Sequence, residues 1–194
     1  MKKIFLVISL LLVLVSCKKD SVLDAFNSIN QELDEQSSVF KEDLKNKING
    51  IKSDSLKLVV VEYDKLTQDY YNYLDKVISN FSVSGNENLS GSNEVNEVFF
   101  DKGRGKHFLE TTNTYRENIL KLTENNSLKA KINFTLNTDN PLNREGKEID
   151  WLEYHFKDFP MIAVITKLKT IQSDVLQLEN EFIDDLLNKN DSTN

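Results

Sequence analysis

The sequence predicts an all-α protein: an antiparallel bundle of about four long helices, with a long loop rich in Gly, Ser and Asn and a short extended segment. Three observations favour this class. The 194-residue chain has only 2 Pro and 6 Gly, too few for the many tight turns of a β sandwich. Charged residues (28%) and hydrophobic residues (39%) occur in the proportions of an ordinary soluble domain. Apolar residues recur at steps of three and four over long stretches, which is typical of amphipathic helices.

The longest helical pattern begins near Pro160 and continues to Leu187. Proline is tolerated in the first turn of a helix, so Pro160 fits the start. Its apolar stripe consists of Met161, Val164, Leu168, Ile171, Val175, Leu178, Phe182 and Leu186. We expect this helix to form the centre of the bundle. Its polar face would then be open to a partner at Lys167, Lys169, Gln172 and Asp174.

Three further segments predict long helices, at about 21–49, 54–81 and 106–125. The first ends at Asn49-Gly50, a common helix stop, and Ser53 or Asp54 can cap the second. Within the second, Tyr70 and Tyr73 are spaced as residues at the edge of a core. A carbohydrate or peptide platform of tyrosines is the alternative for that segment.

The connecting segments have a different composition. Residues 82–105 are rich in Gly, Ser and Asn and predict a loop. Residues 129–135 alternate between polar and apolar, which predicts a short strand or an extended tie, and residues 137–146 predict a loop around Pro141. Residues 151–159 predict an aromatic-rich loop. We expect Trp151, Phe156 and Phe159 in this loop to pack beneath the start of the last helix.

The amino terminus has the pattern of an export signal. Two lysines precede an apolar run from Ile4 to Val15, which is followed by Ser16-Cys17. This resembles the signal peptide of a bacterial lipoprotein, in which the cysteine receives lipid and the residues before it are removed. Residues 4–16 would form only about 20 Å of helix, too short for a bilayer core of about 30 Å. A plain secretory signal is the other alternative.

This pattern predicts three parts: a signal peptide at 1–16, a lipidated Cys17 with a short tether at 17–20, and one helical domain at 21–190. The palmitate-type acyl chains on Cys17 would hold the protein on a membrane. Cys17 is the only cysteine, so an intrachain disulfide is excluded.

Charge and residue spacing argue against several functions. The net charge of -7 disfavours nucleic acid and anionic lipid as partners. His107 and His155 lie in different regions without acids or cysteines at ligand spacing, so we expect no metal and no cofactor. No serine lies in a nucleophile elbow, and adjacent acids such as Asp184 and Asp185 diverge on a helix. We therefore expect no enzyme activity.

The last helix carries a recognisable motif, Pro-x-x-Ala-x-x-Thr-x-Leu-x-x-x-Gln-x-Asp-Val, between Pro160 and Val175. It resembles the last helix of the N-terminal periplasmic domain of GldM, the motor protein of gliding motility and type IX secretion in Bacteroidota. Trp151, Thr114-Tyr115-Arg116 and the stretch from Asp20 to Leu33 are also similar to that family. The resemblance implies an all-helical periplasmic domain that forms dimers.

The chain departs from the family in its anchor, since a lipobox takes the place of a membrane-spanning helix, and it ends after the helical region. We therefore expect a lipid-anchored interaction module in the cell envelope, on the periplasmic side of a membrane or on the cell surface, with the outer membrane favoured. Its partner would be an envelope protein or a second copy, and its role accessory to gliding or type IX secretion. The alternative is a surface lipoprotein that binds a small ligand or glycan through the rings of residues 151–159.

Overall fold

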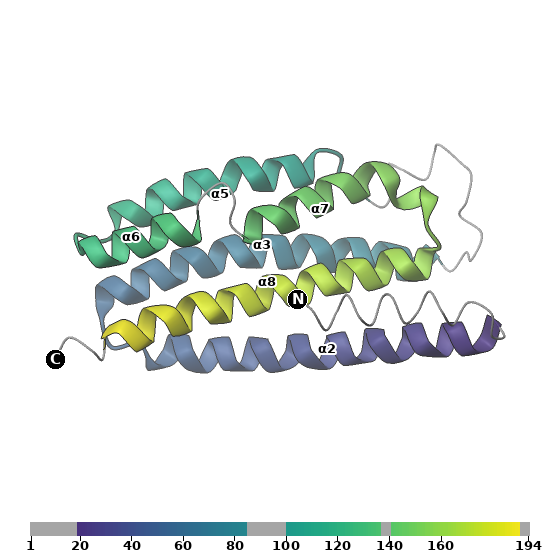
Figure 1. Cartoon of the computed structure of the whole chain (residues 1–194), viewed down its shortest axis with the longest axis horizontal. Helices are drawn as coiled ribbons and strands as arrows, with labels where there is room; N and C mark the ends of the chain where they lie inside the picture. Colours follow the sequence, from purple (N-terminus) through teal and green to yellow (C-terminus); the bar gives the residue numbers. More distant parts are fainter. Residues whose placement is uncertain (1–18, 85–99, 137–140, 191–194) are drawn as a thin grey trace.

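The computed structural model describes residues 19–84, 100–136 and 141–190, and within these ranges it is helical with no strand. The all-α prediction is therefore confirmed (Figure 1). The elements are α2 (Lys19–Gly50), α3 (Asp54–Ser84), α5 (Arg104–Lys121), α6 (Asn126–Thr135), α7 (Pro141–His155), the 3-10 helix η3 (Phe156–Asp158) and α8 (Met161–Asn190). Among these helices, none is long and apolar enough to cross a bilayer.

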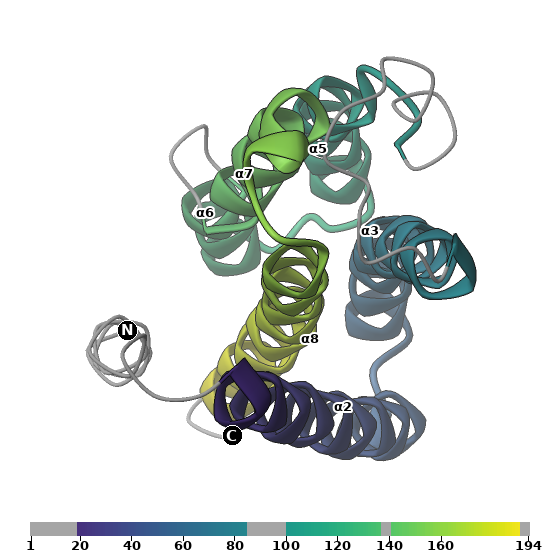
Figure 2. The ribbon, with the colours of Figure 1, turned by 90° about the vertical axis from the view of Figure 1, so that its right-hand side faces the viewer.

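Helix α8 lies at the centre of the molecule. It packs against α2 on one side, α3 on another and α7 on a third (Figure 2). This position agrees with its long apolar stripe, of which Leu168, Ile171 and Val175 have no exposed surface. Helix α2 forms the lower tier of the view in Figure 1, α3 and α8 the middle tier, and α5, α6 and α7 the upper tier.

The helices are not all antiparallel to their neighbours. Helices α2 and α8 run in the same direction, since Asn30 contacts Thr166 near one end of the pair and Lys47 contacts Asp184 near the other. Helix α3 runs opposite to both, with Tyr63 against Phe182 and Gln172 against Tyr71. The chain thus returns through α5, α6 and α7 to the end where α2 begins before it enters α8 (Figure 1).

The two tyrosines at the predicted core edge lie in the core. Tyr70 is fully buried and stacks on Phe108 of α5 with 4.0 Å between ring centroids. Tyr73 meets the same phenylalanine edge-on at 5.6 Å. These rings join α3 to the upper tier, and they leave no tyrosine platform at Tyr70 and Tyr73 for a ligand.

The predicted extended segment at 129–135 is wrong, because these residues form α6. The side chain of Asn125 accepts a hydrogen bond from the backbone nitrogen of Leu128 at 3.1 Å and caps the helix. Ile132 is fully buried while Phe134 is 79% exposed. In a strand these two side chains would share one face, whereas on a helix they diverge by about 200°. The alternation was therefore too short to distinguish the two structures.

Helix α7 was also missed, since the sequence predicted loops at 137–146 and at 151–159. Pro141 stands at the first helical position, and Leu142, Ile149 and Leu152 are buried on one face. Gly146 interrupts the apolar periodicity of this helix. A glycine is favoured there by packing, because a Cβ would lie 3.1 Å from side-chain atoms of Leu109 and Tyr70. Residues 137–140 of the predicted first loop lie outside the described residues.

Two predicted boundaries shift. The third helix begins at Arg104 and ends at Lys121, instead of the predicted 106–125, because the chain turns at Leu122 to Asn125 into α6. The loop predicted at 82–105 is shorter at both ends, since α3 continues to Ser84 and α5 begins at Arg104. Residues 85–99 lie outside the described part of the chain. Ser53 caps α3, as one of the two predicted caps.

Candidate interaction surfaces

A glycine turn at the start of α5 fixes the end of α7. Gly103 adopts a left-handed conformation with φ of 80°. The carboxylate of Glu153 on α7 accepts hydrogen bonds from the backbone nitrogens of Gly103 and Gly105, both at 2.7 Å. A Cβ on Gly105 would lie 2.2 Å from the backbone nitrogen of Asp150, so only glycine fits. This buried contact holds the carboxyl end of α7 against α5.

Burial raises the pKa of Glu153, and the two backbone hydrogen bonds act in the opposite direction by favouring the carboxylate. The turn from Gly103 to Gly105 therefore serves packing, with its backbone donors directed at a side chain of the same molecule. The contact between this turn and Glu153 fixes the end of α7, and with it the aromatic residues located there.

Three rings pack together at that end, those of Trp151, His155 and Phe159, and Tyr154 precedes His155 on α7; we call these four residues the aromatic cluster. Trp151 and His155 stack with ring centroids 4.7 Å apart and planes 7° apart, and Phe159 lies 5.6 Å from Trp151. Nδ1 of His155 lies 2.8 Å from the backbone oxygen of Trp151. Tyr154 is 62% exposed, Trp151 44% and Phe159 45%. The cluster is thus an ordered aromatic surface.

The expectation that Trp151, Phe156 and Phe159 pack beneath the last helix is correct only for Phe156. Phe156 is buried against Phe81 and Phe100, at 5.7 and 5.2 Å between centroids. Trp151 and Phe159 lie outside the core because α7 continues to His155. The helical turn directs Leu152 and Phe156 inward and leaves Trp151 on the outer face.

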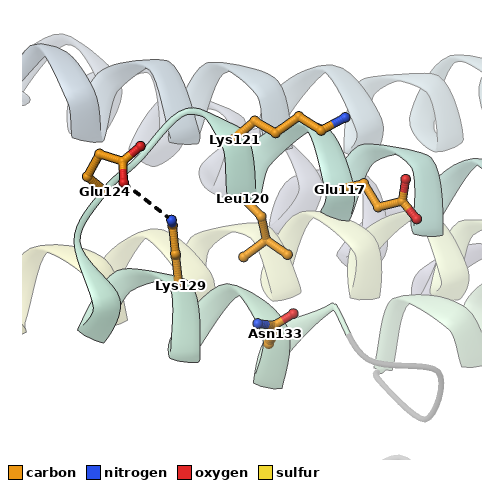
Figure 3. Close-up of a pocket in the computed structure, with 6 residues that line it drawn as sticks. All are labelled: Glu117, Leu120, Lys121, Glu124, Lys129 and Asn133. Carbon is orange, nitrogen blue, oxygen red and sulfur yellow. Dashed lines mark ion pairs between the residues drawn. The ribbon is translucent and has the colours of Figure 1, made fainter.

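A second surface lies between α5 and α6. It is an open depression of about 590 Å³, lined by Glu117, Leu120, Lys121, Glu124, Lys129 and Asn133. Figure 3 shows Leu120 and Asn133 facing each other across it, with Lys129 paired to Glu124 at 3.7 Å. Phe134 follows Asn133 in α6 but does not line the depression, and it is the most exposed large hydrophobic side chain in the described residues. We call this region, with Phe134, the α5–α6 face.

The polar face predicted on α8 is largely engaged by neighbouring helices, although the Lys167 side chain is still 43% exposed and Asp174 is only partly buried. Lys169 pairs with Asp34 of α2 at 2.5 Å, and Lys167 pairs with Glu148 of α7 at 3.1 Å. Gln172 is buried and donates to the backbone oxygen of Tyr71 at 3.5 Å. These residues hold α8 to its neighbours. The prediction failed because α8 is surrounded on three sides, so its polar positions lie between helices.

Sequence patterns did not reveal the most deeply buried acid. Glu179 of α8 has no exposed surface, and its Oε2 accepts a hydrogen bond from the hydroxyl of Thr67 at 2.6 Å. Burial raises its pKa, and the nearby Asp64 carboxylate raises it further. Both effects favour the neutral acid form of Glu179. One sequence feature could have indicated this buried acid. Glu179 is a single glutamate at helical spacing from Leu168, Val175 and Phe182, on an otherwise apolar stripe.

The two histidines do not approach metal ligands. His107 and His155 are both exposed, on different helices. In the described ranges no three His, Cys, Asp or Glu residues are grouped as they would be around an ion. Cys17 lies outside these ranges, so its lipidation stays a prediction.

Comparison with known proteins identifies the family of the chain. A search of the curated proteins finds no match. The family model described as the GldM N-terminal domain matches residues 21–189, which is almost the whole helical region. This agrees with the resemblance seen in the last helix and in the first segment. The chain therefore belongs to the GldM family, through its N-terminal domain.

Proposed function

We propose that the protein is a lipid-anchored, non-catalytic interaction module of the cell envelope, accessory to gliding motility or type IX secretion. The observation that carries this proposal is the family match, which spans residues 21–189. GldM-family proteins are structural components of that machinery and function in envelope protein complexes. The role assigned here is to bind a protein partner at a membrane surface.

The anchor is the acylated Cys17, after removal of residues 1–16. Each buried methylene contributes about 0.8 kcal/mol, so several acyl chains hold the protein stably on a bilayer. Growth with labelled palmitate tests the anchor: label should enter the wild-type chain and be absent from the Cys17→Ala variant. Label in neither protein would remove the lipid from the proposal. We favour the outer membrane, and protease treatment of intact cells distinguishes the cell surface from the periplasm.

The partner surface is the α5–α6 face. Protein interfaces commonly combine an apolar centre with a polar rim. Here the exposed Phe134 ring on α6 and the partly buried Leu120 on α5 supply apolar area. Glu117, Lys121 and Lys129, which line the depression with Leu120, supply charges of both signs. This composition fits a folded protein partner with an apolar contact and charged surroundings. It fits a nucleic acid poorly, because acids stand beside the lysines.

Crosslinking in intact cells, followed by affinity purification from envelope extracts, tests the interaction. The wild-type chain should recover a specific envelope protein, and Phe134→Ser should lose it. Leu58→Ser is the matched control, since Leu58 is also exposed but lies in the first turns of α3. Recovery of no specific protein, or equal recovery by all three chains, would count against the proposal. Crosslinks between two copies would assign a homodimer, the family's arrangement.

A second candidate function is supported by the aromatic cluster. Exposed rings of Trp151 and Tyr154 are of the kind that stack on sugars, which would suit a surface lipoprotein that binds a glycan or small ligand. Titration with envelope-derived oligosaccharides, followed through the fluorescence of the only tryptophan, tests this function. A saturable change in emission would support it.

A further inference from the structure

We propose that the aromatic cluster rests on the membrane, with its rings in the headgroup region of zwitterionic lipid. This inference rests on the proposed anchor at Cys17. It goes beyond the anchor, because it assigns an orientation: the end of the bundle that carries the start of α2 and the end of α7 faces the bilayer.

The aromatic cluster lies at the end of the molecule where α2 begins. The start of α2 and the connection from α7 through η3 into α8 lie at the same end of the molecule (Figure 1). Figure 2 views that end directly, with α7 and α2 on opposite sides of α8. Seven large hydrophobic side chains are exposed in the described residues, and four of them belong to this end: Leu23, Trp151, Tyr154 and Phe159. Exposed apolar side chains are thus concentrated at this end, as is typical of a surface that contacts a partner or a membrane.

The tether between the proposed anchor and α2 is very short. Only Lys18 separates Cys17 from the first residue of α2, so the lipidated residue and Lys19 are at most about 7 Å apart. An acyl chain on Cys17 therefore keeps the start of α2 at the headgroups. Helix α2 has 32 residues and is about 48 Å long, so the opposite end of the bundle can stand far from the membrane. The aromatic cluster lies at the anchored end, so it cannot stand that far from the membrane.

The rings of the cluster have the chemistry of a membrane interface. Tryptophan and tyrosine are enriched at membrane interfaces, where an apolar ring and a polar tip are both satisfied. A sugar needs an open ring face, whereas the Trp151 indole has His155 parallel to one face and Phe159 tilted against it. An interface of headgroups needs only exposed ring edges. The cluster therefore suits a lipid surface better than a stacked glycan.

The charge of the chain favours a lipid without net charge. The chain carries a net charge of -7, and at this end Asp158 lies next to Lys157 in η3, so the end itself offers no excess of cations to anionic lipid. Anionic headgroups would repel the chain as a whole. Phosphatidylethanolamine and phosphatidylcholine carry no net charge, so aromatic contact is unopposed on them.

The only tryptophan in the chain, Trp151, is its own reporter. The full chain is produced in cells, purified from their membranes and reconstituted in phosphatidylethanolamine–phosphatidylcholine vesicles that contain lipids brominated near the headgroup. We expect the emission of Trp151 to shift to shorter wavelength and to be quenched by these lipids. Lipids brominated at the chain ends should quench it less. Unshifted and unquenched emission on protein that sediments with the vesicles would overturn the proposal.

A double variant, Tyr154→Ser with Phe159→Ser, keeps the reporter and removes the neighbouring rings. Its quenching should fall clearly below that of the wild-type chain. Leu58→Ser, changed at the far end of the bundle, should be quenched as the wild type is. Equal quenching of all three proteins would mean that the tether alone brings Trp151 to the lipid, which would overturn a docking role for the cluster. An oligosaccharide that shifts the emission without vesicles and blocks the quenching would do the same, in favour of a glycan.

Failure of the anchor is separated from failure of docking by mass spectrometry of the Cys17 peptide. If Cys17 is unmodified, its thiol is coupled to a maleimide-bearing lipid, which no other residue can compete for because the chain has 1 cysteine. Quenching after this coupling would support docking while the lipidation proposal falls. Lipidated protein without quenching would leave the anchor and remove the docking surface.

Discussion

The two sides of α8 are built from different chemistry. Toward α3 the contact, here called the apolar side, is made by buried aliphatic and aromatic residues, with Tyr63 and Phe182 at 4.2 Å between centroids. Toward α2 the contact, here called the polar side, combines the packing of Phe40, Leu44 and Ile48 with a series of hydrogen bonds and ion pairs. Thr166 donates to Asn30 at 2.9 Å, and the Nζ of Lys47 lies 2.8 Å from Asp184. One central helix thus has a core face and a polar face, both covered.

The difference indicates which helix opens first. Apolar burial contributes about 25 cal/mol per Å², whereas a partly exposed ion pair contributes about 1 kcal/mol or less. Most hydrophobic residues of α3 are fully buried, while Phe26, Ile29 and Leu33 of α2 are only partly buried. We therefore infer that α3 and α8 form the stable unit and that the polar side sets the position of α2. The helix next to the proposed lipid anchor is therefore held less tightly than α3.

The largest expected difference is in the free energy of unfolding lost by two matched Leu→Ala variants. Leu66→Ala on the apolar side removes a fully buried side chain, and we expect a loss of about 3 kcal/mol in the free energy of unfolding. Leu33→Ala on α2 removes a partly buried one, with an expected loss of about 1 kcal/mol. Denaturant unfolding followed by circular dichroism measures both. Equal losses would contradict the distinction between the two sides.

The next effect concerns the acid on the apolar side. Burial raises the pKa of Glu179 above its value in the unfolded chain, so the folded state holds the proton more tightly. The resulting stabilisation is complete below about pH 4.3, the ordinary pKa of glutamate, and is lost as the pH rises through the higher folded value. We expect the free energy of unfolding to fall between pH 5 and pH 8.5. Glu179→Gln should remove most of this slope and stabilise the protein at pH 8.5, by on the order of 2 kcal/mol.

Two comparisons sharpen the test of Glu179. Glu181→Gln changes an exposed acid on the same helix and should leave the slope in place. Burial raises the pKa of Glu145 on α7 to about 7, which gives a slope of the same sign, so the Glu179 variant should keep a smaller residual slope. Unfolding curves at pH 5, 7 and 8.5 for the three chains separate these contributions. A wild-type protein that becomes more stable from pH 5 to pH 8.5 would show that the acid is not buried as described.

The three longest helices could be predicted from periodicity, because each has a single apolar stripe that continues over many turns. The stripe of α8 led to both its position at the centre and its family motif. Helices α6 and α7 could not be predicted in the same way. Helix α6 has only 10 residues, and in α7 a glycine at position 146 interrupts the stripe. Short segments obtain their helical structure from packing against neighbours, and that information is not local.

The candidate surfaces show the same limit. The aromatic composition of residues 151–159 was visible, but exposure depends on which turn of α7 each ring occupies. Phe156 is buried and Trp151 is not, although only four residues separate them. The contact between Glu153 and the turn at Gly103 joins residues 50 positions apart, so no local pattern could reveal it. The polar residues of α8 appeared free because the sequence does not show that three helices surround it.

A smaller effect is expected on the polar side. Lys47 of α2 lies 2.6 Å from Asp43, 2.8 Å from Asp184 and 3.1 Å from Asn180. Lys47→Met keeps the apolar stem and removes the charge, so we expect a loss of about 1 kcal/mol at low salt. Lys76→Met is the control, because its pair with Asp101 is exposed on both sides. Denaturant unfolding should show less than half that loss for the control, and equal losses would remove the special role of Lys47.

The smallest effect is the response of α2 to salt. Ion pairs that are partly exposed to solvent weaken as salt is added, because the Debye length falls from about 10 Å at 0.1 M to about 3 Å at 1 M, whereas apolar packing is not screened. Raising the salt concentration should therefore weaken the pairs of Lys47 with Asp184 and of Lys169 with Asp34, both between α2 and α8. Amide hydrogen exchange should become faster in α2, with a fall of less than about 1 kcal/mol in its opening free energy. Exchange in α3 should stay unchanged. If α3 responds as strongly as α2, the two helices open together, and the polar side is not a separate, weaker contact. A response confined to α2 would mean that the helix nearest the anchor can loosen from α8 while the rest of the bundle stays folded.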